Sequence, residues 1–234
     1  MKPAAKPAVK RRARLNREQV LNTAIALADA GGIEALSMRK LGEELKVEAM
    51  SVYRHVANKE DLLNGMIDAV FAEIELPSHS EDWKTALRKR SLSVRAALLR
   101  HPWATGLMDS GTQPGHATLR HHNRVLGTLR TGGFSVPMAA HAFSAIDSYI
   151  YGFAMQDKAL PFQTEEESAA MAQMLLAQLD ANEYPYLVEL IRDHAAQPGY
   201  HYGDEFTYGL DLVLNALERE RDADLSTPHV EPQE

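Results

Sequence analysis

The chain has 234 residues, a formal net charge of −7 and no cysteine, and 45% of its residues are hydrophobic. This composition is typical of a globular protein with a substantial core, and the lack of cysteine excludes disulfide frameworks, thiolate metal sites and cysteine nucleophiles. No run of about 18 apolar residues and no apolar signal segment occur, so we expect a cytoplasmic protein without a membrane partner.

Charge is distributed unevenly along the chain. Residues 1–60 carry 12 Lys and Arg against 7 Asp and Glu, whereas residues 61–234 carry 13 against 25. Residues 1–14 hold six bases and no acid, and they have the composition of a disordered basic arm. A basic head on an acidic body indicates that the head contacts a polyanion, with a merely solubilising tail as the alternative.

The spacing of apolar residues is helical nearly throughout, and no convincing alternating strand is present. In the first part of the chain, capping residues and Gly or Pro terminators delimit four expected helices, at 16–31, 37–45, 48–55 and 58–76. Longer helices are expected further along, at 81–100, 116–130, 136–157, 165–180, 184–196 and 204–222. We therefore predict an all-α fold.

Residues 37–59 have the pattern of a helix-turn-helix unit. Two short helices are separated by a tight turn, and apolar residues such as Val52 and Val56 can pack inward and fix the angle between them. The second helix can then enter the major groove of DNA with its outward side chains. Tyr53 and Lys59 suit contacts to phosphates. Because any three-helix core can imitate this pattern, a purely structural head is the alternative.

Residues 16–63 resemble the tetracycline-repressor (TetR) family of bacterial transcription factors. The most specific mark is the run Tyr-x-His-Val-x-x-Lys at residues 53–59. Weaker similarity to the C-terminal domain of tetracycline repressors extends through residues 82–102 and the GTQP and GGFS stretches. The resemblance implies an all-α homodimer that binds operator DNA through two N-terminal heads. It also implies that a small molecule in the C-terminal domain changes their spacing and releases the DNA.

The resemblance further implies roles for single residues of the head. Ala49 stands where the tetracycline repressor places a base-reading amide, so we expect a different operator. Arg54 stands where that repressor has an aromatic residue, and we expect it to add a phosphate or base contact. The residues expected at base edges or phosphates are Ser37, Arg39, Ala49, Met50, Ser51, Tyr53, Arg54, His55 and Lys59.

The drug pocket of the tetracycline repressor is poorly matched. Arg90 and Val94 replace an amide and a phenylalanine that contact the drug, and Asp109 stands where a magnesium-ligating histidine is expected. We therefore expect a ligand other than tetracycline, with an acidic compound favoured by the arginine. The residues predicted to line a pocket, each of which could equally be core, are Arg90, Val94, Trp103, Met108, Asp109, Phe143, Asp147, Tyr149 and Phe153.

Other chemistry-bearing clusters favour structural explanations. His116, His121 and His122 have poor spacing for a shared metal on one helix face, so we predict exposed or core-edge histidines and no metal site. One rigid helix cannot fold His141 and Asp147 with a serine into a catalytic array. We expect no cofactor and no enzymatic activity.

Two helices carry more apolar faces than one subunit can bury. The helices at 136–157 and 204–222 each offer a second apolar stripe, which needs a partner subunit to bury it. The resemblance to the TetR family implies an interface formed by two helices from each subunit of a twofold dimer. The residues predicted at this interface are Phe143, Ile146, Ile150, Phe206, Leu210, Val213, Leu214 and Leu217.

Together these features predict four segments: a disordered basic arm (1–14), a helix-turn-helix domain (15–60), a helical ligand-binding and dimerisation domain (61–222) and a disordered tail (223–234). The function expected is that of a homodimeric repressor, which binds a pseudo-palindromic operator and is released by a small-molecule effector. Two alternatives stay open: a helical small-molecule-binding protein or enzyme with a structural head, and a ligand-independent regulator.

Overall fold

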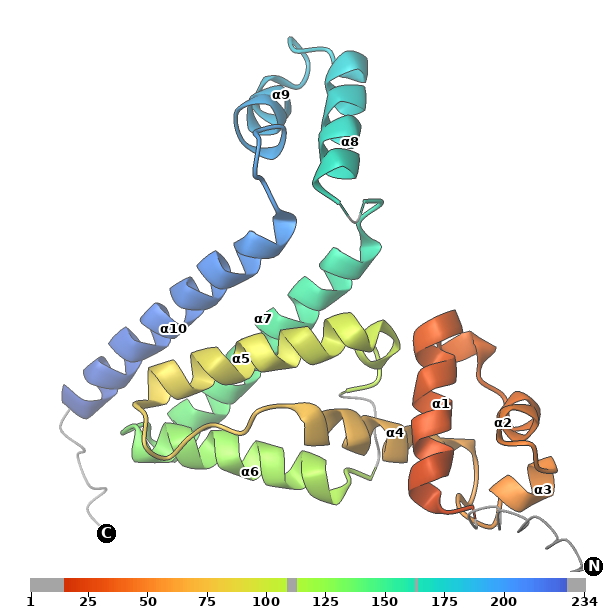
Figure 1. Cartoon of the computed structure of the whole chain (residues 1–234). Helices are drawn as coiled ribbons and strands as arrows, with labels where there is room; N and C mark the ends of the chain where they lie inside the picture. Colours follow the sequence, from red (N-terminus) through yellow and green to blue (C-terminus); the bar gives the residue numbers. More distant parts are fainter. Residues whose placement is uncertain (1–14, 109–112, 163, 227–234) are drawn as a thin grey trace, which may run out of the picture.

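The computed structural model describes residues 15–108, 113–162 and 164–226, and within these ranges every regular element is a helix. The N-terminal head contains α1 (Arg17–Gly31), the short turn η1 (Ile33–Ala35), α2 (Met38–Leu45) and α3 (Ala49–Val52). These helices lie together at one end of the molecule (Figure 1). The predicted arm at 1–14 lies outside the described residues.

The remaining helices form the body. The helix α4 (Lys59–Glu73) runs from the head into the body, where the chain continues as α5 (Trp83–Arg100), η2 (Pro102–Ala104) and α6 (His116–Thr131). These are followed by α7 (Val136–Ala159), α8 (Glu165–Gln178), α9 (Pro185–Leu190), η3 (Ile191–Ala195) and α10 (Tyr202–Ser226). The pair α8 and α9 projects away from the rest of the body (Figure 1). No described helix has the length and hydropathy needed to cross a bilayer.

Local signals explain where the head helices begin and end. Asn16 and Gln19 form the predicted capping box of α1: the Asn16 Oδ1 accepts from the Gln19 amide at 2.8 Å, and the Gln19 Oε1 accepts from the Asn16 amide at 3.2 Å. Lys46 ends α2 in the left-handed conformation, with φ 57°. A Cβ added to Gly42 would lie 3.0 Å from the Val47 carbonyl oxygen, so glycine allows α2 to approach the turn.

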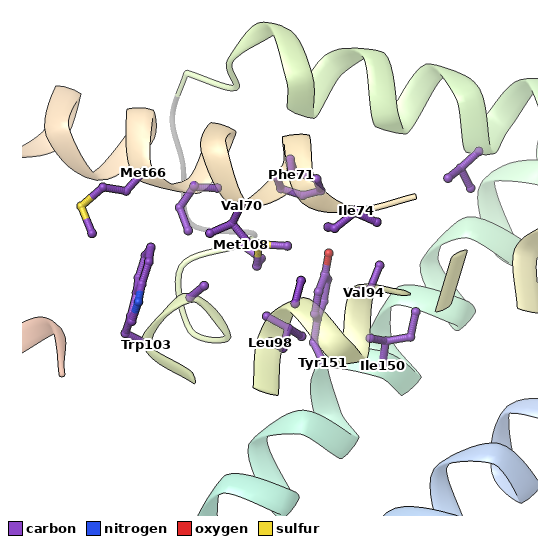
Figure 2. Close-up of a cluster of buried hydrophobic side chains, with 14 of the residues drawn as sticks. Met66, Val70, Phe71, Ile74, Val94, Leu98, Trp103, Met108, Ile150 and Tyr151 are labelled. Carbon is purple, nitrogen blue, oxygen red and sulfur yellow. The ribbon is translucent and has the colours of Figure 1, made fainter. Parts of the chain in front are cut away.

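One continuous apolar core joins head and body. In the head, the buried residues include Val20, Ala24, Leu41, Val52 and Val56. In the body, the side chains of α4 face those of α5, α7 and the segment after η2 (Figure 2). The labelled members of that cluster are Met66, Val70, Phe71, Ile74, Val94, Leu98, Trp103, Met108, Ile150 and Tyr151.

Several predicted boundaries were wrong, among them the following three. The helix α3 ends at Val52, residues 53–55 form turns, and Asn58 begins the next helix. The helix expected at 184–196 is divided into α9 and the π-helical η3. The tail does not begin at residue 223.

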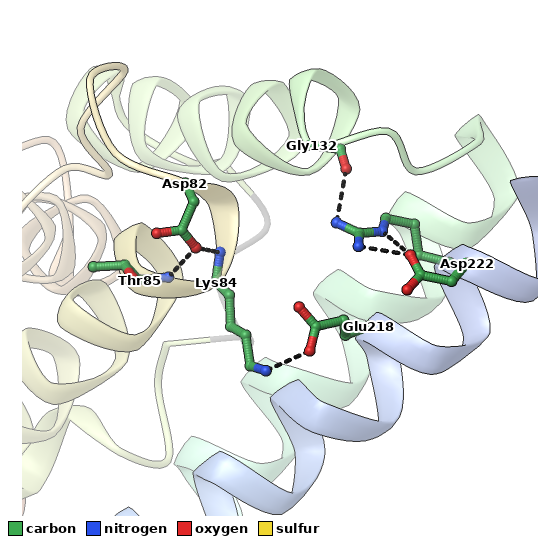
Figure 3. A network of polar contacts seen from close by, with 7 residues as sticks. Asp82, Lys84, Thr85, Gly132, Glu218 and Asp222 are labelled. Atoms are coloured by element: carbon green, nitrogen blue, oxygen red, sulfur yellow. Dashed lines mark hydrogen bonds and ion pairs between the residues drawn. The ribbon is translucent and has the colours of Figure 1, made fainter.

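Contacts of its last turns explain why α10 continues to Ser226. Arg221 donates to the Gly132 carbonyl oxygen at 3.2 Å, and this contact holds α10 against the corner between α6 and α7. The same guanidinium also bonds to Asp222. Lys84 of α5 pairs with Glu218 at 2.6 Å on the same stretch of α10 (Figure 3). The sequence pattern alone could not reveal these long-range partners.

Candidate DNA-binding surface and ligand-binding body

A single arginine holds the turn between α3 and α4. The Nη1 of Arg17 on α1 donates to the His55 carbonyl oxygen at 2.8 Å, and its Nη2 donates to the Asp61 Oδ1 at 2.7 Å. The hydrogen bond from Arg17 keeps the pKa of Asp61 below its usual value. Asp61 also accepts from the Ala57 amide at 2.7 Å. These contacts thereby fix α1, the turn after α3 and the start of α4 relative to one another.

The nine residues predicted to contact DNA all remain at the surface of this head. Met50 is 71% exposed and Tyr53 42%, although both are large and partly apolar. Four more side chains are exposed: Ser37, Arg39, Arg54 and Lys59. The remaining three are half-buried: Ala49, Ser51 and His55. Of the nine residues, eight lie on α2, on α3 or directly beside these helices, and Lys59 is the first residue of α4.

Two of these side chains have partners within the head. The Ser37 hydroxyl oxygen accepts from the Lys40 amide at 3.2 Å and caps α2, which leaves its hydroxyl hydrogen available to a phosphate. Arg39 pairs with Glu43 at 3.6 Å, but its side chain is 85% exposed, so the pair holds it only weakly. Both remain available to DNA.

A buried polar triad lies between three helices of the body. Arg90 of α5 is fully buried; its Nε donates to the His121 Nε2 at 2.9 Å, and its Nη1 pairs with the Asp147 Oδ1. Burial, followed by the charge of Arg90, lowers the pKa of His121 to about 3. The imidazole is therefore neutral, with its proton on Nδ1 because Nε2 accepts from arginine. Arg90 Nη2 and His121 Nδ1 are buried without a hydrogen-bond partner among the described residues.

The sequence predicts Arg90 and Asp147 in a ligand pocket but does not predict their contact with each other or with His121. The expectation that His121 is exposed or at the edge of the core is wrong, because the side chain is fully buried. A signal was available, because the buried residues of α6 recur at helical spacing: Thr118, His121, Val125, Thr128 and Leu129.

The other predicted pocket residues that the structure describes lie in three different places. Val94, Trp103 and Met108 are buried in the core cluster beside α4 (Figure 2). Tyr149 and Phe153 pack with the start of α10: Tyr149 stacks on Phe206 with ring centroids 5.6 Å apart, and Phe153 on Tyr202 at 5.0 Å. Phe143 is half-buried beside His122, with ring centroids 5.3 Å apart. Asp109 lies outside the described residues.

Most residues predicted at the subunit interface are instead buried within one chain. Phe206, Leu210 and Leu214 of α10 and Ile146 and Ile150 of α7 are all fully buried, and Leu217 is 8% exposed. They fill the seam between α7 and α10 of the same subunit, so they offer no surface to a partner. This corrects the prediction: the apolar stripe that we assigned to the interface is the one that the subunit buries itself. Phe143 and Val213 remain half-buried.

Carboxylates connect the head and α4 to the body. Asp29 of α1 accepts from the Trp103 Nε1 at 2.7 Å and bonds to the His101 Nδ1 at 2.8 Å. Asp68 of α4 accepts from both the amide and the hydroxyl of Thr118, at 2.8 and 3.0 Å, in the first turn of α6. One joint, at Asp29, therefore connects α1 of the head to the segment around η2, and a second, at Asp68, connects α4 to α6.

Two family models match the chain in the same two parts. The model described as bacterial regulatory proteins, tetR family, matches residues 20–66, and the model described as tetracyclin repressor-like, C-terminal domain, matches residues 76–221. The transcriptional repressor DrrR1 of Streptomyces coeruleorubidus is 31% identical over 216 residues, which cover 87% of this chain and 77% of that protein. The class D tetracycline repressor of Escherichia coli is 30% identical over 212 residues, covering 88% and 93%.

Solved structures agree with these matches. The TetR family protein ActR of Streptomyces coelicolor, in complex with (S)-DNPA, superposes with a TM-score of 0.74 at 26% identity, covering 89% of this chain and 99% of ActR. Its complex with actinorhodin gives the same TM-score at 27% identity, with the same coverage. Since both halves of the chain match in sequence and in fold, the chain belongs to the tetracycline-repressor family of DNA-binding transcriptional regulators.

Proposed function

We propose that this regulator binds a pseudo-palindromic operator as a homodimer, and that a small-molecule effector in its helical body releases it. The observation that carries the proposal is the surface of α2, α3 and their flanking turns. Arg39, Met50 and Arg54 are exposed there, while the buried Val52 and the Arg17–Asp61 pair fix the backbone beneath them. Such a surface is rigid and rich in donors, as major-groove recognition requires.

Apolar side chains on the outer faces of α7 and α10 support a homodimer. Met155 of α7 is 60% exposed, and Tyr208 and Leu212 of α10 are 68% and 54% exposed. Exposed apolar patches of this kind mark interaction surfaces. A twofold contact through these helices gives the dimer two heads, which matches an operator whose half-sites are related by the same symmetry.

Release requires an effector that binds one arrangement of the heads better than the other. The DrrR1 relative is named a repressor, and ActR has been crystallised with two small molecules. The joints at Asp29 and Asp68 supply the route by which a shift of η2 or α6 moves the head. A coupling of about 1–3 kcal/mol between the ligand and DNA sites is typical of such regulators.

Fluorescence anisotropy tests this proposal with the purified chain and a labelled duplex from directly upstream of its gene. A scrambled duplex is the control, and both are titrated at several salt concentrations. We expect selective, salt-sensitive binding with two subunits per duplex, the stoichiometry being measured by sedimentation.

The chain can also be tested on fragments selected from the whole genome. If it binds both this duplex and those fragments weakly, and if salt does not change the affinity, a helical ligand-binding protein with a structural head would be favoured. Selective binding by one subunit would refute the dimer alone. Selective binding that no small molecule weakens would favour a ligand-independent regulator.

A further inference from the structure

A divided cavity lies beside the core cluster of Figure 2, away from the buried triad. Its first chamber, of about 170 Å³, is formed by the C-terminal parts of α5 and α7 and by η2, with Leu98 of the core cluster in its wall. Its second chamber, of about 230 Å³, extends towards α8 and the start of α10. Arg95, Leu99 and Asp157 line both chambers. Together the chambers reach the lower end of the size range of small-molecule sites.

Arg95 lies at the junction of the two chambers and lines both of them. Its Nη2 donates to the Asp157 Oδ2 at 3.2 Å, and its Nε is buried without a hydrogen-bond partner among the described residues. The guanidinium carbon lies 5.5 Å from the ring centre of Phe153 and 5.2 Å from that of Phe206, so two aromatic faces hold it in place. A guanidinium has five N–H donors, so its pair with Asp157 leaves it able to donate to a ligand as well.

A glycine makes room for this arginine. A Cβ added to Gly203, in the first turn of α10, would lie 2.6 Å from the Arg95 Nη2. The guanidinium is therefore packed against the N-terminal end of α10, where the helix dipole disfavours a cation. This position at the start of α10 favours an anion beside Arg95.

The two chambers differ in charge and in aromatic content. Arg95 and Lys158 in the first chamber face the carboxylate of Asp157, and the Lys158 Nζ donates to the uncharged Pro102 carbonyl oxygen at 3.1 Å. The second chamber contains the aromatic side chains of Phe162, Tyr200 and Tyr202, together with the carboxylate of Glu165 and the polar Thr164, Ser168 and His201. An anionic group therefore suits the first chamber, away from Glu165, and an aromatic ring suits the aromatic faces of the second.

We propose that this cavity is the effector site and that its ligand is a small aromatic carboxylate or phenolate. The anionic oxygen accepts from the Arg95 guanidinium and from Lys158, and the ring lies against the aromatic side chains of the second chamber. The inference rests on the proposed function, and it names the chemical class of the effector.

The position of the cavity connects such a ligand to the head. When Lys158 turns to the anion, it leaves the Pro102 carbonyl oxygen, and the next residue along η2 is Trp103, which donates to Asp29 of α1. A ligand in the first chamber therefore acts on the joint that holds the DNA-binding head. The buried triad of Arg90 is not part of this route.

Isothermal titration with 2-naphthoate tests the site directly, with uncharged 2-naphthalenemethanol as the comparison ligand. We expect naphthoate to bind wild type at least about tenfold more tightly than the alcohol, since hydrogen bonds to a charged group are the stronger ones. Replacing Arg95 or Lys158 by glutamine should each weaken naphthoate binding by about tenfold or more. The third variant, Ala154→Phe, fills the first chamber and should abolish binding.

The matched control is Arg88→Gln. Arg88 lies two turns earlier on α5 and pairs with Asp211 at 2.7 Å, outside the cavity. This variant should bind naphthoate within about twofold of wild type, because its pair is exposed and contributes little. Thermal melts of all variants confirm folding before titration.

Three results would overturn the assignment: no naphthoate binding to wild type, equal binding of naphthoate and the alcohol, or equal losses in Arg95→Gln and Arg88→Gln. Operator binding is measured separately and without the ligand. Loss of operator binding together with Arg95-dependent naphthoate binding would refute the repressor and leave the ligand site standing. Selective operator binding without any naphthoate binding would refute the ligand site and leave the repressor standing.

Discussion

At the residue scale, phosphate and base contacts differ in what their loss does to DNA recognition. Lys59 is exposed at the start of α4 and Tyr53 follows α3, so both are assigned to phosphates. Replacing either by alanine should weaken all duplexes alike, and Lys59→Ala should reduce the slope of log K against log salt by about one. Anisotropy titrations on matched and scrambled duplexes measure both effects. A loss confined to the operator would assign these residues to bases instead.

His121 gives the fold a specific response to acid. Its pKa is about 3 in the folded chain, below the ordinary value of 6.5, so the folded state excludes a proton that the unfolded state binds. Stability from this group is complete above pH 6.5 and is lost as the pH falls towards 3, by about 1 kcal/mol per unit.

Urea unfolding of the variant His121→Gln tests this response at pH 7 and pH 5. Glutamine keeps an acceptor for Arg90 but does not titrate, so the fall in unfolding free energy between the two pH values should shrink by about 1–2 kcal/mol. The exposed His141→Gln on α7 is the matched control. An unchanged fall in His121→Gln would show that other groups cause the acid sensitivity.

At the element scale, local signals predicted the head well and the body less well. The caps at Asn16, Ser37 and Asn58 are formed by the side chains expected from the sequence, and each begins the expected helix. In the body, apolar residues that face the subunit's own core recur at the same helical spacing as residues that face a partner subunit, so the spacing alone does not distinguish the two. Ile150 and Leu210 were therefore assigned to the interface, although one chain buries them. Contacts such as Arg90–His121 join residues far apart in sequence, which periodicity does not reveal.

The start of α6 depends on a side chain from another helix. No side chain of its own N-cap, Gly115, can accept from the first turn, and Asp68 of α4 accepts from Thr118 instead. A Cβ on Gly115 would lie 2.2 Å from the Asp68 Cγ, so glycine allows this approach. The variant Asp68→Ala should lower the unfolding free energy by about 1–2 kcal/mol, as loss of a helix cap does.

Urea denaturation measures that change, and Asp68→Asn, which retains an acceptor oxygen, should lose less. An unchanged midpoint in Asp68→Ala would mean that water replaces the carboxylate without cost. The joint that Asp68 forms between α4 and α6 would then contribute nothing to stability.

At the scale of the whole molecule, the proposed dimer depends on apolar side chains that one chain leaves exposed. Leu212 is 54% exposed on α10, and a glutamate there buries an unpaired charge in a twofold contact. We expect Leu212→Glu to sediment as a monomer that binds a single half-site as wild type does but loses selectivity for the palindrome. A dimer of undiminished stability would place the interface elsewhere.

The joint at Asp29 should set the spacing of the two heads rather than the strength of either. Asp29 accepts from Trp103 and bonds to His101, and these residues belong to the body, whereas Asp29 belongs to α1. Without this carboxylate the heads sample more orientations, and only a fraction of them fit both half-sites at once. The variant Asp29→Ala should therefore bind a palindromic duplex about tenfold more weakly and a single half-site within about twofold of wild type. Equal losses on both duplexes would mean that the substitution disturbs the head itself, and the joint would then have no part in coupling ligand to DNA.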